Sequence, residues 1–564
     1  MDNQRLMIWG LFAFLAWITY QTWVNDFAPQ PVAATNTQTE QSLAPAENAE
    51  LPTLGAPSSD ELDAPAPIED VDDSAPALAE AQSSAETIRV STDVFTLEIS
   101  TQGGTIQSAT LKKYPVAKDR PEDLVQLLGI EPSNFGRIQI GLRIVGEGAE
   151  PNHLATFSSA SNSYALNTAD ELVVPLTWTG PDGTTVEKRY TFRRGSYVIG
   201  VEQIVRNGSE GLWRGVDYAQ IQRISREQER SMFDVDSYSF AGPIVYDGEK
   251  SKKLPHDDLL EDGNYSFKSQ NGWLGAIEHH FVSAIVPQQG DERSYNVSLR
   301  GDRSTTSVIG KAESIAPGSE KTFTTTLFVG PKLQAQLEEI HEELTLTVDY
   351  GWLTIISHPL FLLLSFVYKF VHNWGVAIIV VTFLIKLVFY KLTESSGRSM
   401  AKMRNLQPRM KALQDRYKDD KQALSQAMMD LYKREKVNPA AGCLPILIQM
   451  PFFLAFYWVL LESVEMRQAP FALWITDLST KDPYFILPLI MGAAMFMQQK
   501  LNPAPTDPVQ AKVMQIMPIM FTAFFAFFPS GLVLYWVTNT LLSIAQQWKI
   551  NKVVEQEAKA QKQR

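Results

Sequence analysis

The chain has 564 residues, enough for several domains, and a net charge of −13 that is unevenly distributed. Acidic residues are concentrated after the first apolar segment, whereas the stretches between the apolar blocks of the C-terminal third are basic, which indicates separate compartments rather than one acidic globule. The single cysteine, Cys443, excludes an internal disulfide framework and a cysteine-rich metal site.

The first apolar segment, Leu6 to Val24, is long enough to cross a bilayer. A cleaved signal peptide is the alternative, but signal peptides have an apolar core of about 7–15 residues followed by a small-residue cleavage site. This segment ends in Tyr-Gln-Thr-Trp, so we predict an uncleaved transmembrane anchor over residues 1–26. Arg5 precedes it and acidic residues follow it, which places the N-terminus in the cytoplasm by the positive-inside rule.

Residues 27–88 contain no lysine or arginine and are rich in Ala, Pro, Ser, Asp and Glu, which predicts a disordered acidic linker. Strand-like runs separated by Gly, Asn and Asp turns then recur over residues 89–331 and predict a large antiparallel β-sandwich outside the cytoplasm. The runs are Val94–Ile99, Ile138–Ile144, Val186–Phe192, Tyr197–Val205, Phe281–Val286 and Lys321–Phe328.

Large β-sandwiches often process sugars, but the histidines of this region give that reading little support. His279 and His280 are adjacent, so in a strand their side chains would point to opposite faces. His153 and His256 have no evident partners in the sequence.

Two apolar segments, Trp352 to Val371 and Gly375 to Tyr390, follow a connecting region that starts near residue 332. If both crossed the membrane, the basic region after Lys391 would face outward, against the positive-inside rule. The first contains His-Pro, serine and lysine together with aromatic residues, so we predict an interfacial helix on the outer surface within residues 332–372. The second, within Asn373–Lys391, is then the true span.

Lys386 lies inside that span, where a lysine costs roughly 2.5–3.5 kcal/mol on insertion scales. It therefore faces a partner or a watery cavity, or it extends to the cytoplasmic headgroups, and its position alone does not choose between these. Thr382 shares its helix face. Further polar residues within predicted spans are Gln449, Thr538, Asn539 and Gln546. Together they would line a hydrophilic cavity, or they would form interhelical hydrogen bonds without a cavity.

Residues 392–439 are polar and basic, and their apolar residues recur at spacings of three and four, which predicts a cytoplasmic helical hairpin. Four apolar blocks follow: Leu444–Leu461, Tyr484–Met497, Val513–Phe528 and Leu532–Ala545. With the anchor and the Lys386 span they give six transmembrane helices, five of them in a core over residues 373–548. A basic tail over residues 549–564 places the C-terminus in the cytoplasm.

The sequence contains no nucleotide-binding loop, no zinc-ligand spacing and no His-Glu-x-x-His motif, so we expect neither a cofactor, nor a metal site, nor an enzyme. A secondary transporter with an outer sensor domain is one rival class, but it predicts inverted repeats and intramembrane carboxylates. A membrane-anchored carbohydrate enzyme is another, and it predicts activity in residues 89–331 alone.

Several short runs recur in order from Asp349 onward. They are Asp349-Tyr-Gly-Trp352, Asn373-Trp-Gly375, Ser399-Met-Ala-Lys-Met-Arg404, Lys436-Val-Asn-Pro439 with Gly442-Cys443, Gln449-Met-Pro451, Arg467-Gln-Ala-Pro-Phe471 and Phe528-Pro-Ser-Gly-Leu532. Together they resemble the YidC family of bacterial membrane-protein insertases, which is related to the mitochondrial oxidase-assembly and chloroplast thylakoid insertases. The resemblance implies a polytopic α-helical inner-membrane protein with a periplasmic all-β supersandwich and no nucleotide requirement.

The resemblance also implies residue roles around a hydrophilic groove that opens to the cytoplasm and to lipid. Lys386 stands where the family usually has an arginine that attracts the hydrophilic part of a substrate, and lysine lacks arginine's bidentate geometry. Thr382 matches a groove position, and we expect Gln449 to help to hydrate the groove. Met450, Phe453 and Trp536 match positions that contact the transmembrane segment of the substrate.

The partners that the resemblance implies are nascent membrane proteins, membrane lipid, the Sec translocon, and the ribosome through the hairpin and the basic tail. We expect the protein to insert inner-membrane proteins and to help them fold, alone or with the translocon.

Overall fold

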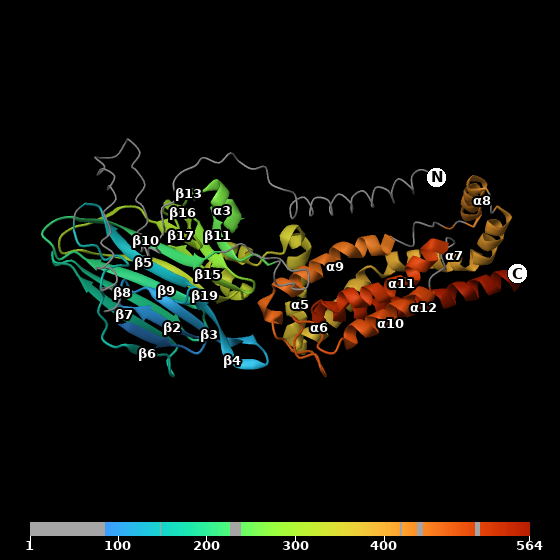
Figure 1. Cartoon of the computed structure of the whole chain (residues 1–564), viewed down its shortest axis with the longest axis horizontal. Helices are drawn as coiled ribbons and strands as arrows, with labels where there is room; N and C mark the ends of the chain where they lie inside the picture. The colour runs from blue at the N-terminus through green and yellow to red at the C-terminus, as the bar shows by residue number, and fades with distance from the viewer. Residues whose placement is uncertain are drawn as a thin grey trace, which may run out of the picture.

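The computed structural model describes residues 85–146, 148–225, 239–417, 420–435, 437, 444–501 and 508–563. The predicted anchor and nearly all of the predicted linker lie outside the described residues. A β-rich domain and a helical domain follow one another along the long axis of the molecule (Figure 1). The β-rich domain extends from β1 to β19, and the helices of the second domain follow it to the end of α12.

The β-rich domain contains two sheets. The larger one has, among the described residues, 11 strands in the order β13 (Tyr265–Ser269), β16 (Arg293–Arg300), β17 (Arg303–Ile309), β10 (Trp213–Ile224), β5 (Gly136–Ile144), β3 (Ile106–Ala117), β2 (Phe95–Ser100), β1 (Thr87–Ser91) and β6 (Ser163–Ala165), with β18 (Glu313–Ile315) paired to β10 and β4 (Arg120–Leu128) paired to β3. The smaller has eight described strands in the order β12 (Ser251–Lys253), β11 (Gly242–Tyr246), β14 (Trp273–Ile277), β15 (Phe281–Pro287), β19 (Glu320–Pro331), β9 (Val198–Arg206), β8 (Thr185–Arg193) and β7 (Glu171–Thr179). The prediction of a large sandwich is confirmed, and the six predicted runs coincide with β2, β5, β8, β9, β15 and β19.

Alternation along the strands explains the packing of the sandwich. In β8, every second residue from Val186 to Phe192 is buried. Because side chains alternate across a strand, these residues face the other sheet and join one core with residues such as Ile99 and Ile140. The strands pair antiparallel, apart from the parallel pair β1 and β6.

Short elements lead from the sandwich to the helical domain. The sandwich itself carries α3 (His256–Asp262), and the connection contains α4 (Gln334–Ile340), η2 (Glu342–Thr347) and η3 (Gly351–Leu353). The helical domain then consists of α5 (Thr354–Val371), α6 (Trp374–Val388), α7 (Tyr390–Arg416), α8 (Lys421–Arg434), α9 (Leu444–Glu462), η5 (Val464–Met466), α10 (Ile486–Leu501), α11 (Pro508–Phe525) and α12 (Ser530–Gln563). Figure 1 shows α5 at the end of the helical domain nearest the sheets, and α7 and α8 at the opposite end.

By length and composition, the helix predicted to lie flat is a better candidate for a span than the helices predicted to cross. Among the described helices, α5 alone is long and apolar enough to span a membrane by itself. The segment around Lys386 passes the same test only as the pair α6 and α7, which is bent by 70° at a short break. The apolar parts of α9, α10 and α11 are shorter. The count of six spans therefore stays a prediction.

The helices after the bend pack in two places. α7 and α8 fold back on each other around a small cluster that contains Leu406 and Met410, with Met428 and Leu431 against it. α12 includes both the last predicted span and the basic tail in one helix, which the sequence analysis divided at residue 549. The helix continues because Ile550 and Val554 are buried against Ala401 of α7, so this part of the tail has a packing partner.

Candidate functional site

Lys386 is held between helices. Its side chain is only 8% exposed, and its Nζ donates a hydrogen bond to Ser543 Oγ of α12 over 2.7 Å. Ser543 Oγ in turn donates to the backbone oxygen of Asn539, one turn earlier, at 2.7 Å. The amino group of Lys386 therefore has a neutral partner on a neighbouring helix, the first of the two alternatives that its position in the sequence left open.

A third helix completes this arrangement. Gln449 of α9 donates from Nε2 to Asn539 Oδ1 at 3.3 Å. Lys386, Gln449, Asn539 and Ser543 thus form a polar cluster that joins α6, α9 and α12. Within the part of the chain that the structure describes, the amino group of Lys386 forms no ion pair with a carboxylate, and its hydrogen-bond partner is the neutral Ser543 hydroxyl.

Thr382 lies on α6 one turn before Lys386 but does not join the polar cluster. It is 1% exposed, and its Oγ1 donates to the backbone oxygen of Ile378 at 2.6 Å within its own helix. Gln546 lies beyond the cluster, where its Nε2 donates to Thr393 Oγ1 at 2.7 Å near the start of α7. The structure thus brings together two of the three predicted groove residues, Lys386 and Gln449, through α12.

The predicted contact residues for an apolar substrate segment are aromatic neighbours. The rings of Phe453 and Trp536 meet edge to face with centroids 4.8 Å apart. Trp536 also contacts Phe525 of α11 at 5.1 Å, so α9, α11 and α12 share this aromatic group. Met450, one turn before Phe453, is 43% exposed. Flexible methionine beside rigid aromatic rings suits contact with apolar segments of varied shape.

The helices α6, α9 and α11 also expose large apolar side chains. They include Phe383, Leu384 and Leu387 on α6, Leu447 on α9, and Ile516, Ile519, Met520 and Phe524 on α11. Soluble proteins rarely expose contiguous apolar patches, and such patches mark interaction with partners or with membranes.

Sequence reasoning missed Ser543, the direct partner of Lys386. The available signal was its position four residues after Asn539, which places both residues on one face of a helix. No pattern in the sequence, however, shows which face of α12 meets α6.

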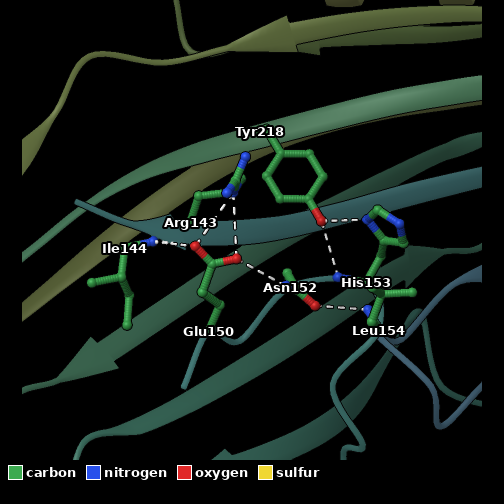
Figure 2. Close-up of polar contacts among 7 residues, drawn as sticks. All are labelled: Arg143, Ile144, Glu150, Asn152, His153, Leu154 and Tyr218. Atoms are coloured by element: carbon green, nitrogen blue, oxygen red, sulfur yellow. Dashed lines mark hydrogen bonds and ion pairs between the residues drawn. The ribbon is translucent and has the colours of Figure 1, made fainter. Parts of the chain in front are cut away.

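The sandwich contains a second group of polar side chains, around His153 and Tyr218 (Figure 2). His153 is 2% exposed, and its Nδ1 lies 2.6 Å from the hydroxyl oxygen of Tyr218. Burial lowers the pKa of His153 to about 3, with Arg137 as the next largest cause. The ring is therefore neutral near pH 7 and enclosed, which suits packing rather than acid–base chemistry.

The loop beside His153 is fixed by an ion pair that Figure 2 also shows. Glu150 pairs with Arg143 at 3.3 Å and accepts from the backbone N–H of Ile144 and from Asn152 Nδ2. Arg143, Ile144 and Asn152 are thus all bonded to the carboxylate of Glu150, which fixes the loop after β5. No cluster of three or more metal-ligating side chains occurs among the described residues.

The opposite-face argument for His279 and His280 does not apply, because it holds only for residues in a strand. They lie in the turn between β14 and β15 rather than in a strand, and their rings stack with centroids 3.8 Å apart. His279 Nε2 lies 2.8 Å from the backbone oxygen of Leu461, and Lys332 Nζ donates to the backbone oxygen of His279 at 2.7 Å. Burial holds the pKa of His280 well below its usual value. These residues join the sandwich to the end of α9.

Comparisons with known proteins cover both domains. A family model described as YidC periplasmic domain matches residues 87–363, and one described as 60Kd inner membrane protein matches residues 366–558. The chain is 46% identical over 575 residues to the membrane protein insertase YidC of Thioalkalivibrio sulfidiphilus, over 99% of this chain and 100% of that protein. It is 45% identical over 563 residues to the membrane protein insertase YidC of Methylococcus capsulatus, over 98% and 99%.

A solved structure of an active YidC insertase with its first transmembrane domain resolved is also similar. It is 18% identical, covers 82% of this chain and 92% of its own chain, and has a TM-score of 0.37.

Proposed function

The chain belongs to the YidC family of membrane protein insertases, and we propose that its polar cluster and its aromatic group form the route by which a nascent segment enters the bilayer. Its function is membrane-protein insertion, and its sandwich is the periplasmic domain of the family. The observation that carries the proposed route is the Lys386 amino group, held in an apolar helix by neutral partners.

The proposed topology has six spans in the inner membrane, with five in the insertase core of residues 373–548 and both termini in the cytoplasm. α5 lies on the periplasmic surface, and the hairpin of α7 and α8 is cytoplasmic. The 70° bend after α6 supports this arrangement, because it marks where an apolar helix gives way to a polar one. The bend then lies at the cytoplasmic surface, and Lys386, three residues before Phe389, lies near that surface.

Lys386 acts first in the proposed mechanism. Among the described residues its hydrogen-bond partner is the neutral Ser543 hydroxyl and no carboxylate pairs with it, so an acidic residue in the polar tail of a substrate can do so. Two opposite charges 4 Å apart attract by about 4 kcal/mol at an effective dielectric constant of 20, much more than in water. Gln449 and Asn539 offer hydrogen bonds that replace part of the tail's hydration. Thr382, predicted as a groove residue, is buried and bonded within α6, so it takes no part in this step. The polar tail therefore crosses a shorter apolar distance.

The apolar segment of the substrate follows along Met450, Phe453 and Trp536 into lipid. Burial of apolar surface, at roughly 25 cal/mol per Å², supplies the free energy, so the step needs neither a nucleotide nor covalent chemistry. The exposed apolar side chains on α9 and α11 extend this surface to the bilayer. The same surface supports a chaperone role, because it shields a segment until its own helices pack.

The proposed partners are the ribosome, the Sec translocon and lipid. The hairpin and the exposed Lys549, Lys552 and Lys559 of α12 present positive charge for ribosome contact. Ile550 and Val554 are buried against α7, so one face of the tail packs on the hairpin and the opposite face is available to the ribosome.

The test of the route uses purified protein in liposomes and two single-span substrates that differ only in an acidic or a neutral polar tail. Lys386→Ala is expected to slow insertion of the acidic-tailed substrate by roughly tenfold, the effect of about 1.4 kcal/mol on a barrier. Insertion of the neutral-tailed substrate should change little, and Lys386→Arg should retain the preference for the acidic tail.

Lys369→Ala is the matched control, because it removes the same charge from an exposed position on α5. If the original protein and Lys386→Ala inserted the acidic-tailed substrate at equal rates, the proposed role of Lys386 would be wrong.

A further inference from the structure

Two short runs that the route leaves without a role, Asn373-Trp-Gly375 and Arg467-Gln-Ala-Pro-Phe471, meet in space. The first begins α6, and the second lies in the loop of residues 463–485 between α9 and α10. Asn373 Nδ2 donates to the backbone oxygen of Phe471 at 2.8 Å. The same side chain accepts through Oδ1 from the backbone N–H of Val376 at 3.0 Å, so one amide caps α6 and ties it to the loop.

Gly375 is required at this contact. A Cβ atom built on Gly375 would lie 2.1 Å from Cδ2 of the Phe471 ring and 2.5 Å from its Cγ, well inside any normal contact. The ring therefore packs directly on the backbone of α6, and no larger residue fits at position 375 unless the ring or the helix moves.

The loop is fixed by its own hydrogen bonds. Asp477 Oδ1 accepts from the backbone N–H groups of Gln468 and Ser479, and the backbone of Phe471 donates to Ile475 at 3.0 Å. Asp482 accepts from Trp474 Nε1 at 3.1 Å through Oδ1. Such a loop resists displacement, so a side chain that contacts it is held in place.

The same loop also holds the starts of two other helices. Asp482 Oδ2 accepts from the backbone N–H of Leu487 at 2.7 Å, at the start of α10. At the start of α12, Ser530 N donates to Thr480 O at 2.7 Å and Gly531 N donates to Leu478 O at 2.9 Å. The loop therefore joins the first turns of α6, α10 and α12 and is continuous with the end of α9.

We propose that the loop of residues 463–485 is a positioning element that sets α6 against α12, with Asn373, Gly375 and Phe471 as its positioning residues. Lys386 lies three helical turns after Gly375, roughly 16 Å along the axis. Its partner Ser543 follows Ser530 on α12. A displacement of α6 at the loop is carried by the rigid helix to Lys386 and disturbs its contact with Ser543. The consequence for insertion rests on the proposed role of Lys386.

Gly375→Ala is the test, with Phe471→Ala as the compensating change. In full-length protein in liposomes, Gly375→Ala should speed hydrogen–deuterium exchange in α6 and lower the preference for the acidic-tailed over the neutral-tailed substrate severalfold. The double variant Gly375→Ala/Phe471→Ala should restore both in part, because it removes Cγ and Cδ2, the two atoms nearest the new methyl group, and leaves only the Phe471 Cβ position at 2.8 Å. A variant that merely unfolds would lose both substrates equally and would not be restored.

The matched control is Gly397→Ala on α7, where the new Cβ would meet only Gln547 Oε1 and Ile550 Cδ1, the ends of flexible side chains, at 2.8 Å. The positioning role would be overturned if hydrogen–deuterium exchange in α6 were unchanged in Gly375→Ala. It would also be overturned if exchange in the double variant were as fast as in the single variant. The exchange result does not involve Lys386. Exchange in α6 that is faster in Gly375→Ala and restored in the double variant, with an unchanged substrate preference, would support the positioning role of the loop and count against the proposed route.

Discussion

Two lysines of this protein, Lys188 and Lys386, are buried and differ in the groups that accept hydrogen bonds from their amino groups. Lys188 lies on the inner face of β8, and its Nζ donates to the backbone oxygens of Gly103 and Ile140 at 2.6 and 2.5 Å. Burial lowers its pKa to about 7. Lys386 donates instead to a side-chain hydroxyl on a neighbouring helix. The backbone partners of Lys188 lie in the β2–β3 turn and in β5 and are fixed by the sheet, whereas a serine hydroxyl can rotate, as the proposed pairing of Lys386 with a substrate carboxylate requires.

Glu465, in the loop after α9, is a buried carboxyl group with an unsatisfied oxygen. Its Oε2 has no hydrogen-bond partner, and burial raises its pKa from 4.5 to about 7. The folded protein therefore keeps a proton that the unfolded chain releases above about pH 4.5. This contribution to stability is complete below that pH and is lost as the pH rises through about 7.

Glu465→Gln is expected to raise the apparent melting temperature in detergent at pH 8 and to leave it nearly unchanged at pH 5, because glutamine resembles the protonated acid. Thermal unfolding at both pH values measures the difference. Glu342→Gln, at an exposed carboxylate, is the control and should show no such pH dependence. An equal effect of Glu465→Gln at both pH values would contradict the assigned protonation.

At the scale of elements, α5 has the pattern of a helix that lies at a surface. Its buried residues, from Ser357 to Val367, recur at spacings of three and four and face α6 and α9. The remaining surface is divided lengthwise. One edge carries Thr354, His358, Ser365 and Lys369, and the neighbouring edge carries exposed Ile355, Leu362, Phe366 and Phe370. A polar edge along the whole helix suits an interface and would be costly across a hydrocarbon core.

Cysteine labelling distinguishes the two orientations of α5. With Cys443 replaced by serine, single cysteines at His358 and Lys369 should both react with a membrane-impermeant maleimide added to the periplasmic side. A cysteine at Lys549, in the proposed cytoplasmic tail, should react only after permeabilisation. Labelling of only one α5 position from outside, or of neither, would show that α5 enters the bilayer.

At the scale of the whole molecule, the sandwich is attached to the helical domain through the hairpin of β3 and β4. Arg467 Nη2 donates to the backbone oxygens of Pro115 and Val116 at 2.9 and 3.2 Å, and its guanidinium lies 5.5 Å from the centre of the Phe281 ring. From the other side, Lys118 Nζ donates to the backbone oxygen of Gln468 at 3.1 Å. The loop that holds α6 thus also holds the sandwich.

Arg467→Ala is expected to loosen this attachment without unfolding either domain, because its bonds to Pro115 and Val116 and its contact with Phe281 run between the two domains. Hydrogen–deuterium exchange should become faster in the tip of the β3–β4 hairpin and stay unchanged in the central strands β5 and β10. Arg193→Ala, which removes an exposed ion pair with Glu171 elsewhere on the sandwich, is the control. Unchanged exchange at the hairpin tip would show that Arg467 does not hold the domains together.

The sequence by itself determined the local elements and the family of this protein. The alternation of β8 predicts a half-buried strand, and Pro529-Ser-Gly531 predicts a turn between the last two apolar blocks. The break lies slightly earlier, over residues 526–529, and Ser530 and Gly531 already belong to α12. Both signals lie within a few consecutive residues, where backbone preferences and side-chain periodicity act directly. The family runs from Asp349 onward are equally local. They identify an insertase before any contact is known, and the full-length relatives bear this out.

The tertiary structure alone decided which distant residues meet. The Lys386–Ser543 bond, the Phe471 ring on Gly375 and the burial of Ile550 on α7 each join segments far apart in the chain. Periodicity shows that a helix has a polar or an apolar face but not which neighbour covers that face. That choice depends on how all the helices pack together, because each contact gains free energy only when the others are in place.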